Sequence, residues 1–219
     1  MKRALSCLLL AFPFCAFSEL KEDTTPPAIT VYTQFEHPYS TTSMDTMREE
    51  LGAIMSPLGL DFTWRDLSKS HGNEVSVELV VVTFKGTCEM DGPTANTEQT
   101  GALGWTHMSD GAILPFSDVD CDKIRRFIAP ELRSLDRRDR DLAYGRAVGR
   151  VLAHELYHVF TNTTKHAAWG VAKAAYTSKE LAAIQFQFQE KDTKALRSGK
   201  LKLLVHTARP PVLGYSRNR

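Results

Sequence analysis

Alternating and continuous apolar runs along the chain predict five strands. The strongest signal covers residues 75–84, where Val77, Leu79 and Val81 alternate with other residues and the run 80–82 is wholly apolar. Such a run is typical of a strand buried in the middle of a sheet. Shorter patterns of the same kind predict strands at residues 29–35, 61–66, 102–107 and 112–116, the last two joined by the turn Ser109-Asp110-Gly111.

Apolar residues spaced three and four positions apart predict helices instead. Residues 43–55 place Met47, Leu51 and Ile54 on one face, with Ser43 at the start, and residues 121–132 have a shorter pattern. The longest helix is predicted at residues 141–160, where the apolar stripe consists of Leu142, Val148, Val151, Leu152, Leu156 and Val159. Asp141 is expected to cap its start, and Asn162 to take a left-handed conformation at its end.

The order of these elements is strand, helix, four strands and two helices. This order predicts an α+β fold in which a mixed sheet packs on helices, followed by a small C-terminal helical region. The chain has 219 residues, of which 42% are hydrophobic, and this is enough for one core. We expect a single domain over residues 28–219.

The longest predicted helix contains the segment His154-Glu155-Leu156-Tyr157-His158, which has the pattern HExxH. Two histidines four positions apart lie on the same helical face one turn apart, so both rings can reach one metal ion. Glu155 then lies near the ion without needing to bind it. These residues predict half of a catalytic Zn²⁺ site, with Glu155 as the general base for a zinc-activated water.

A catalytic zinc ion usually has three protein ligands and an open position for water. The predicted helix ends just past His158, so the chain is expected to turn back and supply another ligand soon afterwards. His166 is the nearest candidate, and we favour it. The metal ligands predicted from the sequence are therefore His154, His158 and His166.

The segment HELYH, placed after a sheet-rich N-terminal half, resembles the zincin metallopeptidases over roughly residues 28–176. The resemblance implies a twisted mixed sheet packed on an active-site helix. It also implies that an edge strand, here residues 101–107 or 112–116, holds an extended peptide by strand addition. The longer segment HELYHVFTNTTKH, followed by GVAK, is similar to uncharacterised secreted bacterial proteins, which supports His166 without assigning an activity.

The resemblance leaves the zincin clan open. Metzincins place a glycine and a third histidine where this chain has Thr161 and Thr164, and the absence of methionine after Met108 excludes their Met-turn. The chain is therefore metzincin-like without that turn. In gluzincins a downstream glutamate is the third ligand, and Glu180 or Glu190 could take that place. Glu180, however, also completes the capping box Thr177-Ser178-Lys179-Glu180.

The N-terminus predicts export. Residues 1–18 combine a basic start, a short apolar stretch and small residues at a cleavage site, as in a secretory signal peptide, and residues 19–27 read as a flexible lead-in. The apolar stretch is too short to span a bilayer. Cleavage removes Cys7 and Cys15 and leaves Cys88 and Cys121, which are expected to form a disulfide in a secreted or periplasmic protein.

The charge balance excludes an electrostatic preference for nucleic acid. Lys and Arg number 27 and Asp and Glu number 26 in the whole chain, a net charge of +1. Residues 191–219 form a local exception, because basic residues there face a single acid, Asp192. A basic tail of this kind is usually a solvated surface, although contact with an anionic envelope or polymer is the alternative.

Motif and resemblance together predict a secreted zinc-dependent metalloendopeptidase with a peptide or protein substrate. The alternatives are a zinc amidase acting on cell-wall peptides and a non-catalytic zincin-fold binding module. The intact Glu155 argues against the binding module, because a structural zinc site tends to have four protein ligands.

Tyr176 is a candidate oxyanion donor or a packing residue. Trp105 and Trp169 are candidates for a substrate subsite or for packing in the core or rim. Gly170 either lets the chain pass close to the cleft or forms an ordinary turn. His107 is a candidate for a position at the border of the cleft.

Overall fold

The computed structural model describes residues 29–76, 78–91 and 101–198. Its sheet has the strand order β2-β1-β3-β5-β4. The strands are β1 (Ile29–Phe35), β2 (Phe62–Asp66), β3 (Leu79–Lys85), β4 (Gly104–Ser109) and β5 (Ala112–Asp120). Neighbouring strands are parallel except for β4 and β5, which are antiparallel. The predicted α+β class with a mixed sheet is therefore confirmed.

Several predicted segments lie outside the described residues. They are the signal peptide at residues 1–18, the lead-in at residues 19–27 and the basic tail beyond residue 198.

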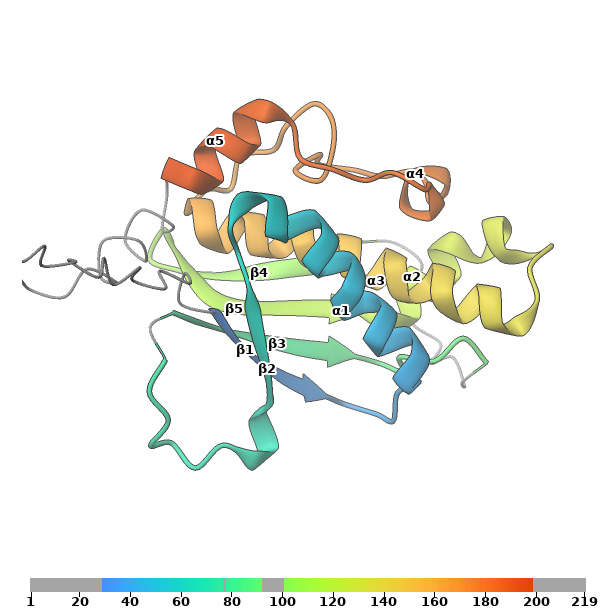
Figure 1. Cartoon of the computed structure of the whole chain (residues 1–219), viewed down its shortest axis with the longest axis horizontal. Helices are drawn as coiled ribbons and strands as arrows, with labels where there is room; N and C mark the ends of the chain where they lie inside the picture. Colours follow the sequence, from blue (N-terminus) through green and yellow to red (C-terminus); the bar gives the residue numbers. More distant parts are fainter. Residues whose placement is uncertain (1–28, 77, 92–100, 199–219) are drawn as a thin grey trace, which may run out of the picture.

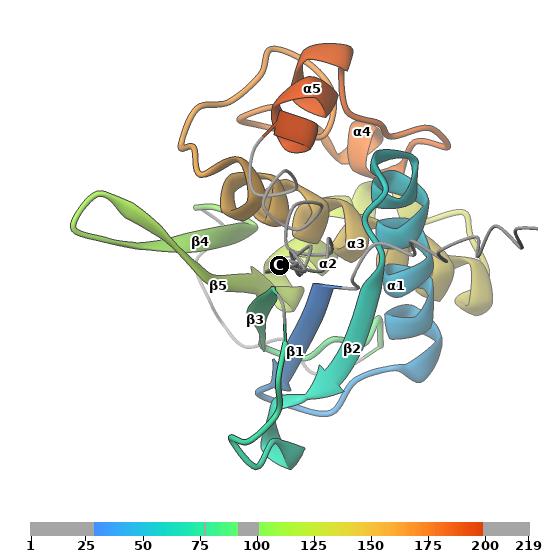
Figure 2. The ribbon, with the colours of Figure 1, turned by 60° about the vertical axis from the view of Figure 1, so that its left-hand side comes forward.

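The helices are α1 (Thr41–Met55), α2 (Cys121–Ile128), α3 (Arg137–Thr161), α4 (Ser178–Ala182) and α5 (Glu190–Ser198). Helices α1 and α3 cover one face of the sheet, and α4 and α5 lie beyond them (Figures 1 and 2). Val80, Val82 and Phe84 of β3 are fully buried, as expected for the central strand of a sheet packed on helices. Among the described helices, none is both long and apolar enough to cross a membrane.

Two glycines allow α1 to lie directly on α3. A Cβ atom at Gly145 would clash with the Ser43 carbonyl oxygen, and one at Gly149 would lie 2.7 Å from the Met47 carbonyl oxygen. The two helices therefore approach at backbone distance. These contacts hold the turns of α3 that precede HELYH directly against α1.

Arg150, in the middle of α3, ties three elements together. Its side chain is fully buried, with Nε 2.6 Å from Oε1 of Glu50 on α1. Its guanidinium also donates to the carbonyl oxygen of Leu181 on α4, at 2.8 Å. A buried charge requires such partners, so this arginine fixes α3 relative to α1 and α4.

The predicted strand bounds are partly wrong. β3 begins at Leu79 and not at Val75, which is 93% exposed. The start of β3 is set by its pairing with β1, which begins at Ile29 and whose Thr30 lies opposite Leu79. β4 lies two residues later than predicted. β5 continues to Asp120, beyond the predicted end at residue 116, because its polar second half pairs with both β3 and β4.

The predicted helix starts are wrong by two and four residues. Ser40, not Ser43, caps α1, and its hydroxyl accepts from the Ser43 N–H. Asp136, not Asp141, caps α3. Residues 137–140 form a largely exposed first turn of α3, and exposed residues add nothing to the apolar stripe from which the helix was predicted.

The helix ends agree better with the sequence. Asn162 ends α3 in the left-handed conformation, with φ 50° and ψ 49°, as predicted. The predicted helix 121–132 stops at Ile128 and continues as the 3-10 turn Ala129–Leu132. Pro130 lies in that turn and provides no N–H for an α-helical bond.

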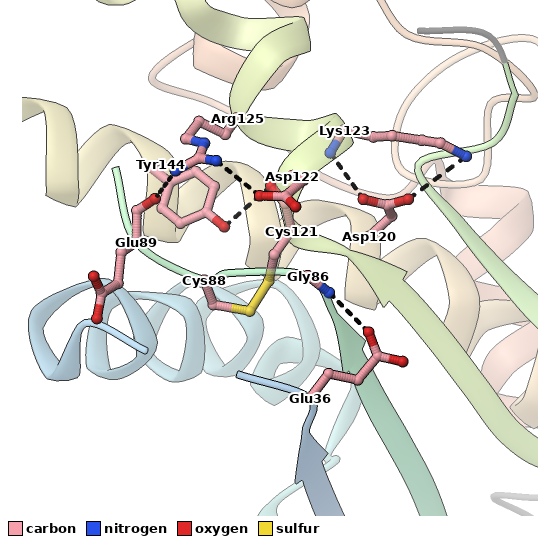
Figure 3. A network of polar contacts seen from close by, with 10 residues as sticks. All are labelled: Glu36, Gly86, Cys88, Glu89, Asp120, Cys121, Asp122, Lys123, Arg125 and Tyr144. Carbon is pink, nitrogen blue, oxygen red and sulfur yellow. Dashed lines mark hydrogen bonds and ion pairs between the residues drawn. A yellow bond between two sulfur atoms is a disulfide. The ribbon is translucent and has the colours of Figure 1, made fainter. Parts of the chain in front are cut away.

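The predicted disulfide between Cys88 and Cys121 is present, and both residues are fully buried. It joins the segment after β3 to the first residue of α2 (Figure 3). The start of α2 is thus held to the centre of the sheet.

Replacing both cysteines, Cys88→Ala with Cys121→Ala, is expected to lower the free energy of unfolding by about 4 kcal/mol. The reason is that the bond closes a loop between positions 33 residues apart and so restricts the unfolded chain. Urea denaturation of oxidised wild type and the double variant measures the difference. Wild type under reducing conditions is the control and should match the variant, whereas equal stability of variant and oxidised protein would contradict the prediction.

Candidate metal centre and cleft

Three histidines meet at the C-terminal end of α3. His154 and His158 lie on successive turns of the helix and are buried, and His166 comes from the following loop and is exposed. Their ligand nitrogens all lie within 4.8 Å of one another. The Nε2 atoms of His154 and His158 are 3.1 Å apart. The structure therefore brings together all three histidines that the sequence singled out.

Backbone carbonyls determine how the two helical histidines are oriented. Nδ1 of His154 lies 2.8 Å from the Val171 oxygen, and Nδ1 of His158 lies 2.7 Å from the Thr163 oxygen. A carbonyl oxygen only accepts hydrogen bonds, so each Nδ1 must carry the proton and donate it. In the neutral rings both Nε2 lone pairs then face each other. This arrangement fits a cation, which would accept both lone pairs.

Burial also favours the neutral form of these rings. It lowers the pKa of His154 to about 4, against the Val171 hydrogen bond, which raises it. Burial likewise lowers the pKa of His158. Neutral imidazole is the form that binds metal, so both rings are ready ligands at neutral pH.

The loop after α3 supplies the two carbonyls by turning back sharply. The left-handed Asn162 ends the helix, and the Ala167 N–H then donates to the Ala172 oxygen at 2.7 Å. Gly170 forms the turn with φ 73°, and a Cβ atom there would lie 2.6 Å from the Gln187 oxygen. Gly170 is therefore a turn glycine packed on the segment before α5. Nothing in the sequence pattern identified the carbonyls of Thr163 and Val171.

Glu155 is buried beside the histidines and is held by β4. Its Oε2 accepts a hydrogen bond of 2.9 Å from Thr106 Oγ1, which is also 3.2 Å from Ser117 Oγ on β5. Burial raises the pKa of Glu155 to about 7, and the Thr106 hydrogen bond opposes that rise. A carboxyl group with this pKa can both take and release a proton near neutral pH.

Gly104 lets β4 come close enough to make that contact. A Cβ atom there would lie 2.9 Å from Val151 Cγ1 and 3.1 Å from Glu155 Cγ. The sequence placed Gly104 and Thr106 in a candidate substrate-holding edge strand, residues 101–107, but gave neither residue a contact with Glu155. No local signal could have found that contact, because Thr106 and Glu155 are 49 residues apart and share no motif.

A cavity of about 660 Å³ lies over the site, between β4, α2 and the loop after α3. His154, Glu155, His158 and His166 line it, together with residues 101–106. Tyr176 also lines it, with its hydroxyl 2.9 Å from His154 Nδ1 and hydrogen-bonded to the Val171 oxygen. Burial raises the pKa of Tyr176, so its hydroxyl stays protonated and can donate. Trp105 lines the cavity, whereas Trp169 is 69% exposed and does not.

The other candidate residues lie elsewhere. The carboxylate of Glu180 accepts from the Thr177 N–H at 2.7 Å, completing the predicted capping box, and is 2.6 Å from Lys173 Nζ. Glu190 pairs with Lys194 on α5. His107 does not line the cavity, because its Nε2 lies 3.1 Å from Asp118 Oδ2 in a separate, smaller pocket.

Comparison with models of known protein families and with curated proteins finds no match for this chain. The geometry of the three histidines, Glu155 and the cavity is therefore the basis for assigning a function.

Proposed function

We propose that this protein is a secreted or periplasmic zinc-dependent metalloendopeptidase with a zincin-like fold. The observation that carries the proposal is the pair of facing Nε2 atoms, 3.1 Å apart, on rings whose Nδ1 atoms are committed to backbone carbonyls. His166 completes a set of three imidazoles, which suits zinc and leaves room for a further ligand.

Glu155 performs the proton transfers in this proposal. A bound zinc ion would polarise the carbonyl of the scissile peptide bond and lower the pKa of a nearby water molecule. Glu155 takes a proton from the attacking water on its carboxylate and then donates it to the nitrogen of the leaving amine. Thr106 holds the carboxylate in place for both transfers. Tyr176 Oη lies on the cavity wall and would donate to the developing oxyanion after its proton turns away from the Val171 oxygen.

The edge position of β4 supports an extended peptide as the substrate. β4 is the last strand of the sheet and lines the cavity along with Glu155. A peptide can therefore pair with its backbone by strand addition and place one carbonyl beside the histidines. An edge strand that can hold a peptide beside the HELYH helix is what the zincin resemblance implies, and the buried Cys88–Cys121 disulfide supports an oxidising compartment.

The experiment that tests the proposal combines metal analysis with peptide cleavage. Purified mature protein is analysed for metals by mass spectrometry and is incubated with a random peptide library, before and after chelation and after return of zinc. We expect about one zinc ion per chain and cleavage that is lost on chelation and restored by zinc. Absence of zinc even after supplementation would favour a non-catalytic binding module. Zinc without cleavage of any peptide would favour an amidase, to be assayed on cell-wall peptides.

Replacing Thr106 with valine is expected to move the acid limb of the pH profile of kcat/KM to higher pH. The Thr106 hydrogen bond lowers the pKa of Glu155, so its loss raises that pKa, and the carboxylate form is reached only at higher pH. The measurement is kcat/KM on one library peptide across the pH range. Thr83→Val, on β3 and outside the cavity, is the control. An unshifted acid limb in the Thr106→Val variant would show that this limb does not report Glu155.

A further inference from the structure

The cavity has a cationic end that the proposed proton transfers do not use. Lys123 and Arg126 lie three positions apart on α2, and both line the cavity. Among the described lining residues, Glu155 has the only carboxylate. Met108 and Ile113, which pair near the end of β4, add apolar lining to the cavity. Among the described residues, the α2 end of the cavity thus holds two cations and one flanking carboxylate, that of Asp120, 3.5 Å from Lys123 Nζ.

Several contacts hold the start of helix α2, which carries both cations, in place (Figure 3). The disulfide holds its first residue, Cys121, whose carbonyl oxygen also accepts a hydrogen bond from the Tyr144 hydroxyl. Beneath it, Arg125 forms a buried 2.8 Å ion pair with Asp122 and donates to the Glu89 oxygen at 2.7 Å. The backbone that carries the two cations is therefore ordered before a ligand binds, so only their side chains need to be fixed on binding.

Asp120 orients Lys123 without using all of its donors. Its carboxylate caps α2 by accepting from the Lys123 N–H at 2.8 Å and lies 3.5 Å from Lys123 Nζ (Figure 3). An ammonium group has three N–H donors, so Lys123 keeps donors for a ligand in the cavity.

The direction of β4 places the cationic end relative to a bound peptide. β4 begins beside α2, since the Asp120 N–H at the base of that helix donates to the Leu103 oxygen at 2.9 Å. From there it runs along α3, with Gly104 against Val151 and Thr106 against Glu155. Antiparallel strand pairs outnumber parallel pairs about two- to threefold. A peptide paired antiparallel to β4 has its C-terminal half at the α2 end.

We propose that Lys123 and Arg126 bind a carboxylate of the substrate on the C-terminal side of the cleaved bond. This substrate preference rests on the proposed peptidase function. The carboxylate belongs either to an Asp or Glu side chain or to the free C-terminus of a short peptide. Both sources present the same anion to the two cations.

Binding measured on the Glu155→Gln variant tests this preference without requiring cleavage. The probes are three fluorescein-labelled peptides, Ala-Ala-Leu-Ala-Glu-Ala amide, its Gln-for-Glu twin as the amide, and the same twin with a free C-terminal acid. Fluorescence anisotropy gives the Kd of each. We expect at least one carboxylate peptide to bind about fivefold more tightly than the neutral amide, with the difference falling in about 0.5 M salt. The Glu amide reports a side-chain source and the free acid a C-terminal source.

Matched variants assign the effect to the cationic end. Lys123→Gln and Arg126→Gln, each in the Glu155→Gln background, are expected to remove the preference, whereas Arg133→Gln, at an exposed position outside the cavity lining, should keep it. Equal binding of all three peptides, no binding of any, or an unchanged preference in both cavity variants would overturn the proposal. Failure of wild type to cleave peptides would instead count against the peptidase function, because the binding assay does not depend on hydrolysis.

Discussion

Replacing Glu155 with glutamine is expected to lower kcat/KM for peptide hydrolysis by about a thousandfold while zinc content stays unchanged. Glutamine has nearly the same shape, and its amide oxygen can still accept the hydrogen bond from Thr106. It cannot take a proton from water, so the transfer that splits the peptide bond is lost. The measurements are kcat/KM on a library peptide and zinc per chain by mass spectrometry.

The control for this variant is Glu190→Gln, which changes an exposed carboxylate on α5 outside the cavity. It should retain full activity. If Glu155→Gln kept its activity with zinc bound, the general base would have to be another group. Loss of zinc together with activity would instead show that Glu155 supports the metal site.

Replacing His166 with alanine is expected to weaken zinc binding by about a hundredfold or more, and activity with it. The substitution leaves only two imidazoles for the ion, while His154 and His158 stay oriented by their backbone carbonyls. His166 is exposed on a loop, so the fold itself should lose little stability. Competition with a coloured zinc chelator measures the affinity, and thermal unfolding of the metal-free protein measures the stability.

Glu180→Ala is the matched control, because Glu180 is the other third ligand suggested by the sequence. Its carboxylate is engaged by the α4 capping box and by Lys173, so zinc affinity should be unchanged. Stability should fall by about 1 kcal/mol through loss of the cap. The reverse pattern, with zinc binding weakened in Glu180→Ala alone, would remove His166 from the site.

Local periodicity explains which features the sequence could predict. His154 and His158 share a helical face whatever the rest of the chain does, and the αL end at Asn162 follows from the polar stop after α3. The disulfide followed from counting the cysteines that remain after removal of the predicted signal peptide. The start of α3 was missed because its first turn is exposed and carries no apolar stripe, and the start of α1 was missed because its first two residues, Thr41 and Thr42, are polar and exposed.

Contacts between distant segments explain what the sequence could not predict. The Thr106 hydrogen bond to Glu155 depends on β4 lying against α3, which in turn needs Gly104 at the crossing. The position of Lys123 at the end of the cavity depends on how the disulfide and the buried Asp122–Arg125 pair hold α2.

The sequence by itself determined the donor pair and the carboxylate of HELYH, the order of strands and helices along the chain, and the cysteines available to pair. The tertiary structure alone decided which nitrogen of each helical histidine faces the proposed ion, because the Val171 and Thr163 carbonyls that take the Nδ1 protons reach the rings only after the chain turns back. It also decided the raised pKa of Glu155 and the shape of the cleft. The raised pKa and the cleft both arise because segments far apart in the chain bury Glu155 between them. A local sequence pattern cannot predict such burial.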